Sequence, residues 1–264
     1  MRSSFNAPRT LTAVLIACLW TSAASAQGAP ETTPPNDDKP FCDRYGLVTV
    51  LLRCLPHDLG GLARTDALVS LGVGGALAGV SHHFDDEVFR KFAEPQEDTS
   101  VAVGRVIGEA GVQFGAPAAA YFITRAIGSE GGQQLSIMIV RTQMVNAVLT
   151  RGLKLFPRAR PYQQDATPGQ GSFPSGHASA SFATATVVQR KWGWKAGVPA
   201  YAAATFISVT RLQNVHFLSD VTFGAAVGIA SGLAINLPGP HPTVAPLIAP
   251  GVVGVSITIG APRS

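Results

Sequence analysis

Apolar residues recur with helical spacing along most of the chain from Asp66 onward, and polar stretches separate the runs. The runs predict six helices, at 66–81, 102–126, 133–152, 177–190, 195–210 and 219–236. After Pro250-Gly251, every second residue from Val253 to Ile259 is apolar and β-branched, which is typical of a short β-hairpin. The pattern therefore predicts an all-α bundle of about six helices, followed by a small hairpin in the tail 242–264.

The N-terminal stretch differs from the rest of the chain. An apolar run follows two arginines and precedes a small-residue cleavage site, Ala24-Ser25-Ala26, which predicts a signal peptide over residues 1–26. The alternative is a bacterial lipoprotein signal, in which Cys18 would be lipidated. Both predict an exported, periplasmic protein. Residues 27–40 are rich in Pro, Thr and Asp and indicate a disordered linker before a helical domain at 41–241.

Composition narrows the class of protein. The sequence has 264 residues, enough for one medium-sized domain with a substantial core. Only 14% of the residues are charged and glycine is abundant, which favours helices that pack closely. The repeat Gly224, Gly228 and Gly232 predicts one such contact along the last helix. The net charge of +4 is not gathered into a basic stripe with interleaved aromatic residues, so we expect no nucleic-acid partner.

Two short clusters are open to more than one interpretation. Cys42 and Cys54 enclose a short loop and, in an oxidising compartment, are typical of a disulfide, with two free thiols as the alternative. The run from His82 to Glu87 contains histidines and carboxylates, but it lacks the ligand spacing of a known metal site. We therefore expect a solvated loop there and no metal.

The stretch from Gly171 to His177 predicts a helix start that binds an anion. Pro174 and Gly176 flank Ser175, and a run of small residues follows. Unpaired N–H groups and the positive end of the helix dipole make such a start favourable for negative charge. His177 would stand where it can give a proton to the bound group or take one from it. An ordinary helix cap with an uninvolved histidine is the alternative.

Two flanking segments favour the anion site over the ordinary cap. Three fixed cations precede it, at Lys154, Arg158 and Arg160. After it, His216 and Asp220 are four residues apart, so on a helix the carboxylate could hold the imidazole in one tautomer and make its free nitrogen nucleophilic. In an up-and-down bundle the three segments share one rim. Together they favour attack on a phosphate ester, whose charged oxygens need neutralising.

The three segments resemble the signature of the type 2 phosphatidic acid phosphatase and vanadium haloperoxidase superfamily. That signature is a Lys followed by Arg-Pro, then Pro-Ser-Gly-His, then Ser-Arg and His-x-x-x-Asp. The resemblance implies that His216 is the nucleophile that forms a phosphohistidine, that Asp220 orients it, and that His177 protonates the leaving oxygen. It also implies the residues that bind the phosphate: Lys154, Arg160, Ser175, Gly176 and Arg211.

The match departs from the family pattern in its spacing. Lys154 and Arg160 enclose five residues where the family usually has six, and His216 lies five positions after Arg211 rather than six. Thr210 takes the place of a frequent Ser. The reach of Lys154 and Arg211 toward the phosphate is therefore in question.

The shorter spacing leads to a prediction about the first segment. Arg158 could substitute for a cation that no longer reaches the phosphate. Because Pro157 disfavours helix, we expect the third helix to end at or before Phe156 and a non-helical segment to carry the arginines across the pocket. Of the two arginines, Arg160 should be the closer to His216.

The resemblance implies an enzyme, a phosphoric ester hydrolase of the acid phosphatase or lipid phosphate phosphatase type. It would need no metal and no other cofactor, and its partner would be a phosphate ester or a lipid phosphate. Two alternatives remain: a haloperoxidase that holds vanadate at the same rim, and an envelope protein whose site has lost activity. A serine hydrolase is disfavoured because Ser175 lacks a Gly-x-Ser-x-Gly context.

Whether the bundle crosses a membrane depends on its apolar runs. The charge-free runs 67–81, 110–124 and 196–210 are each 15 residues long, and only 221–240 reaches 20, about the length that a span needs. An odd number of crossings before the site would also turn the basic loop Arg190–Lys195 outward, against the positive-inside tendency. We therefore favour a periplasmic domain that is soluble or associated with a membrane.

Overall fold

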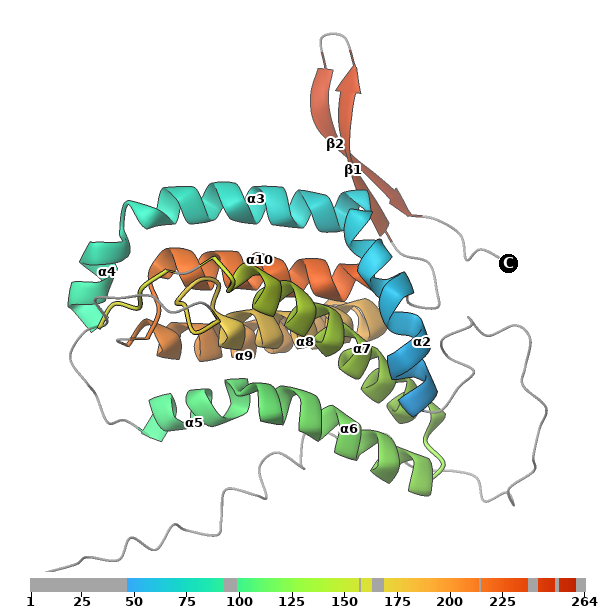
Figure 1. The fold of residues 1–264 in the computed structure, drawn as a ribbon. Coiled ribbons are helices and arrows are strands. Elements are labelled where there is room, and N and C mark those ends of the chain that lie inside the picture. The colour runs from blue at the N-terminus through green and yellow to red at the C-terminus, as the bar shows by residue number, and fades with distance from the viewer. Residues whose placement is uncertain are drawn as a thin grey trace, which may run out of the picture. The chain divides into compact units, whose positions relative to one another are not determined.

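The computed structural model describes residues 47–92, 99–156, 158–162, 169–213, 215–236, 242–249 and 252–259. The predicted signal peptide, the predicted linker and Cys42 lie outside these residues. The described part of the chain forms a bundle of helices followed by a pair of strands (Figure 1).

Helices precede strands along the described part of the chain. In order, the helices are α2 (Leu47–Gly60), η2 (Gly61–Ala63), α3 (Thr65–His82), α4 (Asp85–Phe92), α5 (Thr99–Gly108), α6 (Ala110–Ala126), α7 (Glu130–Leu153), α8 (Gly176–Trp192), α9 (Trp194–Val209), η3 (Thr210–Leu212) and α10 (Leu218–Ala234). Strands β1 (Pro242–Ala249) and β2 (Val252–Ile259) pair in antiparallel register, with Pro242 opposite Ile259. The predicted all-α bundle and the predicted hairpin are confirmed.

Five of the six predicted helices match observed ones closely, and the sixth is divided. The run predicted as one helix over 102–126 forms α5 and α6, which are separated by Glu109 in an extended conformation (φ −64°, ψ 140°). Before the break, Gly108 packs so closely that a Cβ there would come within 2.6 Å of both His177 and Ile207. Tertiary packing at Gly108 accompanies the break, and the periodicity of the sequence carries no sign of it.

Helices α2 and α4 were not predicted, and α4 corrects an interpretation of the sequence. The run from His82 to Glu87 is not a solvated loop, because His82 ends α3 and Asp85 begins α4. Three carboxylates in the first turn of α4 suit the positive end of its dipole. Asp85 is only 3% exposed.

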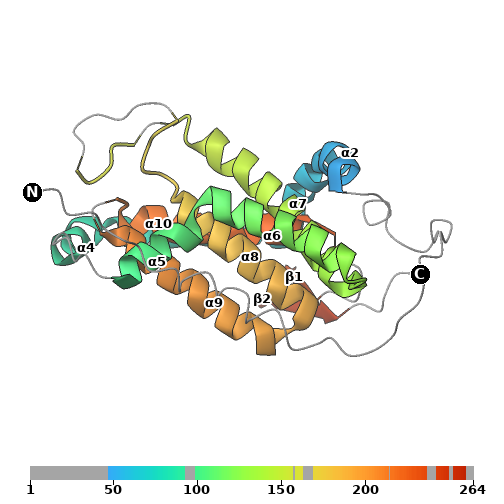
Figure 2. The ribbon, with the colours of Figure 1, turned by 90° about the horizontal axis from the view of Figure 1, so that it is seen from below.

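Helices α8 and α10 form the centre of the bundle. Helix α10 packs against α3 and α8, and α8 lies between α7 and α9 (Figure 2). A Cβ at Gly228 would lie 2.2 Å from the backbone oxygen of Ser179, and one at Gly224 would lie 2.7 Å from that of Ser175. The close contact predicted from the glycine repeat is therefore confirmed, and its partner is α8.

A buried ion pair joins α2 to α7. Arg141 donates from Nε to Asp58 Oδ2 at 2.8 Å and from Nη2 to Oδ1 at 2.6 Å. One turn earlier on α2, Cys54 is buried and disulfide-bonded. Its partner lies outside the described residues, so pairing with Cys42 stays a prediction.

The described helices were also compared with the requirements of a membrane span. Within the described ranges, no single helix is both long enough and apolar enough to cross a membrane. Helices α3 and α4, bent by 70° at their junction, meet the requirement of length and composition only as a pair.

Three segments meet at one end of the bundle, as the order of the helices predicted. Helix α7 ends at Leu153, before Phe156 as expected, and Lys154 Nζ then donates to the backbone oxygen of Gly171 at 2.7 Å. The N–H of Ser175 donates to the backbone oxygen of Asp220 at 3.0 Å. The end of α7, the start of α8 and the start of α10 thus share one rim.

Candidate active site

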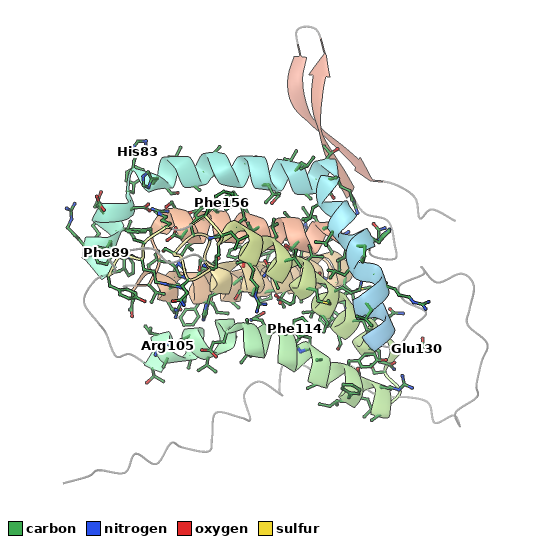
Figure 3. The ribbon with its side chains drawn as sticks, viewed as in Figure 1. His83, Phe89, Arg105, Phe114, Glu130 and Phe156 are labelled. Carbon is green, nitrogen blue, oxygen red and sulfur yellow. The ribbon has the colours of Figure 1, made fainter. Side chains whose placement is uncertain are left out.

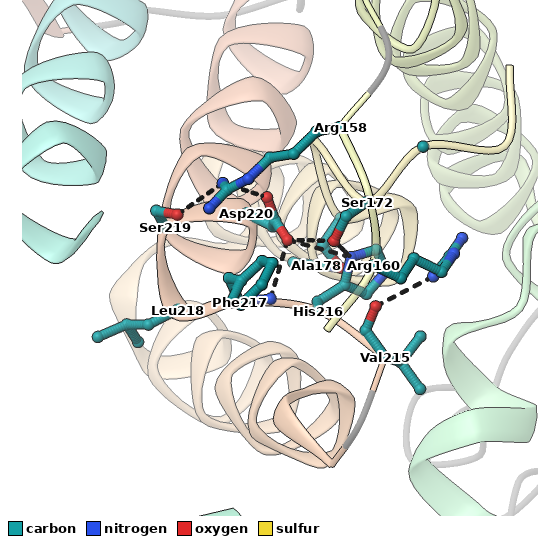
Figure 4. Close-up of polar contacts among 12 residues, drawn as sticks. Arg158, Arg160, Ser172, Ala178, Val215, His216, Phe217, Leu218, Ser219 and Asp220 are labelled. Atoms are coloured by element: carbon teal, nitrogen blue, oxygen red, sulfur yellow. Dashed lines mark hydrogen bonds and ion pairs between the residues drawn. The ribbon is translucent and has the colours of Figure 1, made fainter. Parts of the chain in front are cut away.

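His216 and Asp220 lie at the start of α10 and are almost fully buried, at 4% and 0% exposure. Asp220 Oδ2 accepts from the N–H of Phe217 at 2.8 Å and from the hydroxyl of Ser172 (Figure 4). The Nδ1 of His216 lies 3.7 Å from the same oxygen and 3.4 Å from Ser172 Oγ. Because Nδ1 is turned to the carboxylate, Nε2 is the ring nitrogen left for another partner.

The surroundings keep Asp220 ionised and His216 neutral. Burial alone would raise the pKa of the Asp220 carboxyl, but hydrogen bonds from His216 and Ser172 hold it below its ordinary value. Burial lowers the pKa of His216, against the effect of Asp220, and the cations Arg160 and Lys154 lower it further. A neutral imidazole whose Nδ1 faces an ionised carboxylate is suited to nucleophilic attack through Nε2.

The start of α8 is a helix cap that also offers N–H groups to an anion. Ser175 is the N-cap, and its fully buried hydroxyl accepts from the N–H of Ala178 at 3.5 Å. Gly176 is the first helical residue, and N–H groups in a first helical turn have no partner within the helix. The Ser175 hydroxyl is therefore used inside the cap, whereas the backbone around Gly176 suits a phosphate.

The ring of His177 is held by α5, a contact that no sequence signal indicated. Its Nε2 donates to the backbone oxygen of Arg105 at 3.1 Å, and Gly108 packs against the ring; Arg105 is labelled on α5 in Figure 3. Burial, with the charge of Arg211, lowers the pKa of His177 to about 4. At neutral pH and without a ligand, His177 is therefore neutral.

Lys154 and Arg160 both lie at the rim. Burial and the charge of Arg160 lower the pKa of Lys154 to about 8. Arg160 Nη1 donates to the backbone oxygen of Val215 at 3.1 Å, so this arginine is anchored on the residue next to His216 (Figure 4). The segment that the sequence assigned to phosphate binding thus reaches the nucleophile candidate.

Arg211, in η3, is the clearest sign that the rim receives an anion. It is 8% exposed, and its Nε is among the few buried side-chain polar atoms of the described residues that have no hydrogen-bond partner. Leaving a buried donor unpaired costs about 1–3 kcal/mol. Burial and the charges of Arg105 and Arg160 lower its pKa. An anionic oxygen at this position would satisfy the nitrogen and reduce the repulsion.

Arg158 does not take the place of a phosphate-binding cation. Its Nη1 donates to Asp220 Oδ1 at 2.7 Å and its Nη2 to Asp85 Oδ2 at 2.8 Å. The guanidinium also lies over the ring of Phe217, 4.6 Å from its centroid. The hypothesis that Arg158 substitutes for a cation of the family pattern is therefore wrong, because both terminal nitrogens are used by carboxylates.

The structure brings the predicted residues to one rim, and it adds three that sequence reasoning missed. The predicted set is Lys154, Arg160, Ser175, Gly176, His177, Arg211, His216 and Asp220. The added residues are Ser172, Arg105 and Asp85. Only Ser172 had a signal, since it stands in the stretch already singled out. Among the described residues, no three or more His, Cys, Asp or Glu side chains are grouped to hold a metal ion.

Part of the chain, the part that holds these residues, is similar to known proteins. Residues 135–237 match the family model described as the PAP2 superfamily, and all the predicted site residues fall in this range. A curated relative, the lipid A 1-phosphatase of Porphyromonas gingivalis, is 33% identical over 125 residues, which are 44% of this chain and 27% of the relative. The chain thus spans about a quarter of the length of this relative.

Two crystal structures are similar in part. A transmembrane PAP2 type phosphatidylglycerolphosphate phosphatase from Bacillus subtilis has a TM-score of 0.46 and 18% identity, over 63% of this chain and 92% of that one. Aquifex aeolicus LpxE has a TM-score of 0.43 and 25% identity, over 57% of this chain and 93% of that one. Because both TM-scores are below 0.5, no argument is built on these two similarities.

Proposed function

Because residues 135–237 match the model of the PAP2 superfamily, we propose that this chain is a phosphoric ester hydrolase that acts through a phosphohistidine on His216. One observation carries the proposal: a buried neutral imidazole, oriented by Asp220, shares a rim with Arg211, whose buried Nε has no hydrogen-bond partner among the described residues. The first supplies a nucleophile, and the second offers a charged donor to an anionic oxygen.

The first chemical step transfers the phosphoryl group to the enzyme. His216 Nε2 attacks phosphorus, the bond to the leaving oxygen breaks, and the ring becomes cationic with its Nδ1–H facing Asp220. His177 gives a proton to the leaving oxygen. In the second step a water molecule gives its proton to His177 and attacks the phosphohistidine, which releases phosphate and restores His216.

Binding of the phosphate protonates His177, the proposed general acid. His177 has a pKa of about 4 without ligand, so at neutral pH it holds no proton to give. A phosphate dianion beside the ring raises that pKa, because a nearby negative charge favours the protonated form. The anion also stabilises the charged form of Lys154, whose pKa is about 8. Substrate binding thus leaves His177 protonated and Lys154 charged.

A lipid phosphate is the substrate class that the surroundings support best. Beside the rim, Leu155, Phe156 and Tyr162 are exposed apolar side chains, and Phe156 is 75% exposed. Large apolar side chains are also exposed along α3, at Leu68, Val73, Leu77 and Val80. Such surfaces suit association with a membrane, and the curated relative is a lipid A 1-phosphatase. We place the protein at the periplasmic face of a membrane, after export.

A phosphate-release screen tests the proposed reaction. Purified protein is given lipid A, phosphatidylglycerolphosphate, phosphatidic acid and a soluble phosphomonoester, with EDTA present. We expect release from a lipid phosphate without added metal, and loss of turnover in His216→Ala, with Asn236→Ala as an exposed control far from the rim. A phosphoenzyme trapped in His216→Ala would contradict the assignment of the nucleophile.

The same preparation separates the alternatives. Peroxide-dependent halide oxidation that needs added vanadate would identify a haloperoxidase. Failure both to release phosphate and to bind inorganic phosphate in calorimetry would identify an inactive envelope protein. No observation on the structure favours either, and the proposed reaction needs no vanadate.

A further inference from the structure

A second buried carboxylate lies behind the His216–Asp220 pair. Asp85 comes from α4, which sequence analysis placed in a solvated loop, yet it is 3% exposed. Its Oδ1 accepts from the N–H of Ser219 at 2.9 Å, and its Oδ2 accepts from the hydroxyl of Ser219 at 2.6 Å. The same Oδ2 lies 2.8 Å from Nδ1 of His82. Asp85 thus caps the first turn of α10, the turn that carries Asp220.

Arg158 connects the two carboxylates. Its Nη1 reaches Asp220 Oδ1 at 2.7 Å and Ser219 Oγ at 2.8 Å, while its Nη2 reaches Asp85 Oδ2 at 2.8 Å. Asp220 uses its other oxygen toward His216. A continuous line of charged groups therefore runs from Asp85 through Arg158 and Asp220 to the nucleophile.

The net charge of Asp85, Arg158 and Asp220 determines how well a cationic His216 is stabilised during the reaction. Arg158 alone would cancel the charge of Asp220, and a neutral pair would stabilise a cationic His216 poorly. Asp85 adds a second negative charge on the far side of Arg158, so the three groups together keep a net charge of −1. Burial alone would raise the pKa of Asp85, but hydrogen bonds, first those from Ser219, hold it below its ordinary value, which keeps this charge in place.

We propose that Asp85 and Arg158 are positioning residues that set the charge His216 experiences, with Arg158 fixing Asp220 and Asp85 offsetting Arg158. The inference rests on the proposed roles of His216 and Asp220. Neither residue touches the phosphate. Their effect reaches the reaction through the ease with which His216 becomes cationic when its Nε2 is phosphorylated.

Other charged groups lie around the site on neighbouring elements, and two of them, Lys154 and Arg160, lower the pKa of His216. The groups are Lys154 at the end of α7, Arg160 after it, His177 on α8, Arg211 in η3, Arg105 and Glu109 beside α5, and His82 at the end of α3. All stay in place when Asp85 or Arg158 is changed. The variants therefore differ from the natural protein by one charge on the line from Asp85 to His216.

The test measures the pKa of His216 directly. Protein labelled with ¹³C and ¹⁵N in histidine contains six such residues, and the signal of His216 is identified by its absence in His216→Gln. The full chain is titrated as Asp85→Asn, Arg158→Gln and the double variant. Asp86→Asn is the matched control, because this exposed neighbour on α4 loses the same charge outside the line. The acidic limb of kcat/KM is recorded for each, since it reports the base of the free enzyme.

The two single variants should shift the pKa of His216 in opposite directions. Arg158→Gln removes the positive charge that offsets Asp220, the partner of the ring, and should raise the pKa of His216 by about one unit. Asp85→Asn removes a more distant negative charge and should lower it by about half a unit. The double variant should lie between the two single variants, about half a unit above the natural value if the two effects add. Arg158→Lys, which keeps the charge, should shift the pKa less than Arg158→Gln.

Residues that only hold α4 in place would give a different result. Asp85→Asn would then reduce the yield of folded protein and leave the titration of His216 unchanged, which would overturn the inference. Equal shifts in Asp85→Asn and Asp86→Asn, or shifts of the same sign in Asp85→Asn and Arg158→Gln, would also overturn it. The titrations are repeated in a His82→Gln background, because His82 contacts Asp85. Asp85→Asn and Arg158→Gln must still shift the pKa of His216 in opposite directions in that background.

These outcomes are distinct from failure of the proposed function. If the natural protein releases no phosphate but the pKa shifts appear, the reaction is wrong and the charge line stands. If phosphate is released and the shifts are absent, the reaction stands and the charge line is wrong.

Discussion

On the α10 side of the rim, Asp220 is fully buried and each of its carboxylate oxygens accepts hydrogen bonds from protein groups. On the opposite side, counting the described residues alone, the buried Nε of Arg211 has no hydrogen-bond partner, and Lys154 and Arg160 donate to backbone oxygens. The first side is complete without a ligand, whereas the second is not.

The difference separates two tasks that one site must perform. A nucleophile needs a fixed orientation before substrate arrives, and that orientation comes from bonds made on folding. A phosphate-binding surface needs donors that water or protein has not already satisfied, because only those gain from the ligand. Substitutions on the two sides should therefore differ in their effects on stability as well as on rate.

The largest loss of activity should come from a substitution on the α10 side of the rim, where Asp220 is already fully hydrogen-bonded. Asp220→Asn keeps a side chain of the same shape but cannot stabilise a cationic imidazole, so we expect kcat to fall by about 10³-fold to 10⁴-fold. Circular dichroism should show an intact helical fold. Activity within tenfold of the natural protein would mean that another carboxylate orients His216.

On the side of the rim that carries Arg211, a substitution should lower activity but raise the stability of the free protein. Arg211→Met removes an unsatisfied buried donor, so we expect the free protein to be more stable by about 1 kcal/mol. The same change should lower kcat/KM by about 10²-fold to 10³-fold, because a donor to the transition state is lost. Urea unfolding and steady-state kinetics measure the two effects.

Ser172→Ala is the matched control on the complete side. Its hydroxyl is fully buried and bonded to Asp220, so its loss should cost stability as well as rate. If Arg211→Met also loses stability, the guanidinium is satisfied in solution and the contrast between the two sides fails.

The two sides of the rim also differ in how well the sequence predicted their residues. The residues proposed to attack or bind the phosphate stand in short motifs with fixed spacing, so His216, His177 and Arg211 could be singled out from the sequence. The five helices that match their predictions were found because apolar residues recur along each run with helical spacing, whatever element the helix packs against.

Residues that complete the site from distant elements left no such signal. Asp85 is polar and stands among polar neighbours, and only the packing of α4 against α10 makes it buried. Arg158 was considered as a substitute for a phosphate-binding cation because the sequence shows its charge and not the two carboxylates that it pairs with. The position of the His177 ring depends on its hydrogen bond to the backbone oxygen of Arg105, and a backbone oxygen has no signature in the sequence.

A smaller effect distinguishes the two cations nearest the nucleophile. Arg160→Ala should lower kcat/KM by about 10²-fold, and Lys154→Ala by about tenfold, because a guanidinium can bind phosphate through two parallel hydrogen bonds. Lys154 also loses part of its charge near pH 8, so the cost of Lys154→Ala should shrink as pH rises through about 8. The measurement is kcat/KM from pH 6 to 9. A larger loss in Lys154→Ala throughout this range would reverse the assignment.

The smallest effect concerns the apolar residues beside the incomplete side. Leu155 and Phe156 follow α7 directly and are 66% and 75% exposed, which favours contact with a lipid layer over packing in the protein. Replacing both with Ser should raise KM for a lipid phosphate in vesicles by about fivefold to tenfold, as expected when apolar area of this size stays in water. Hydrolysis of a soluble phosphomonoester should change less than twofold, because the phosphate-binding donors are untouched. Ile127→Ser, which removes a 67% exposed apolar side chain just after α6, is the control and should leave both substrates unaffected. Equal losses on vesicle and soluble substrates would show that the two residues support the loop and do not contact lipid.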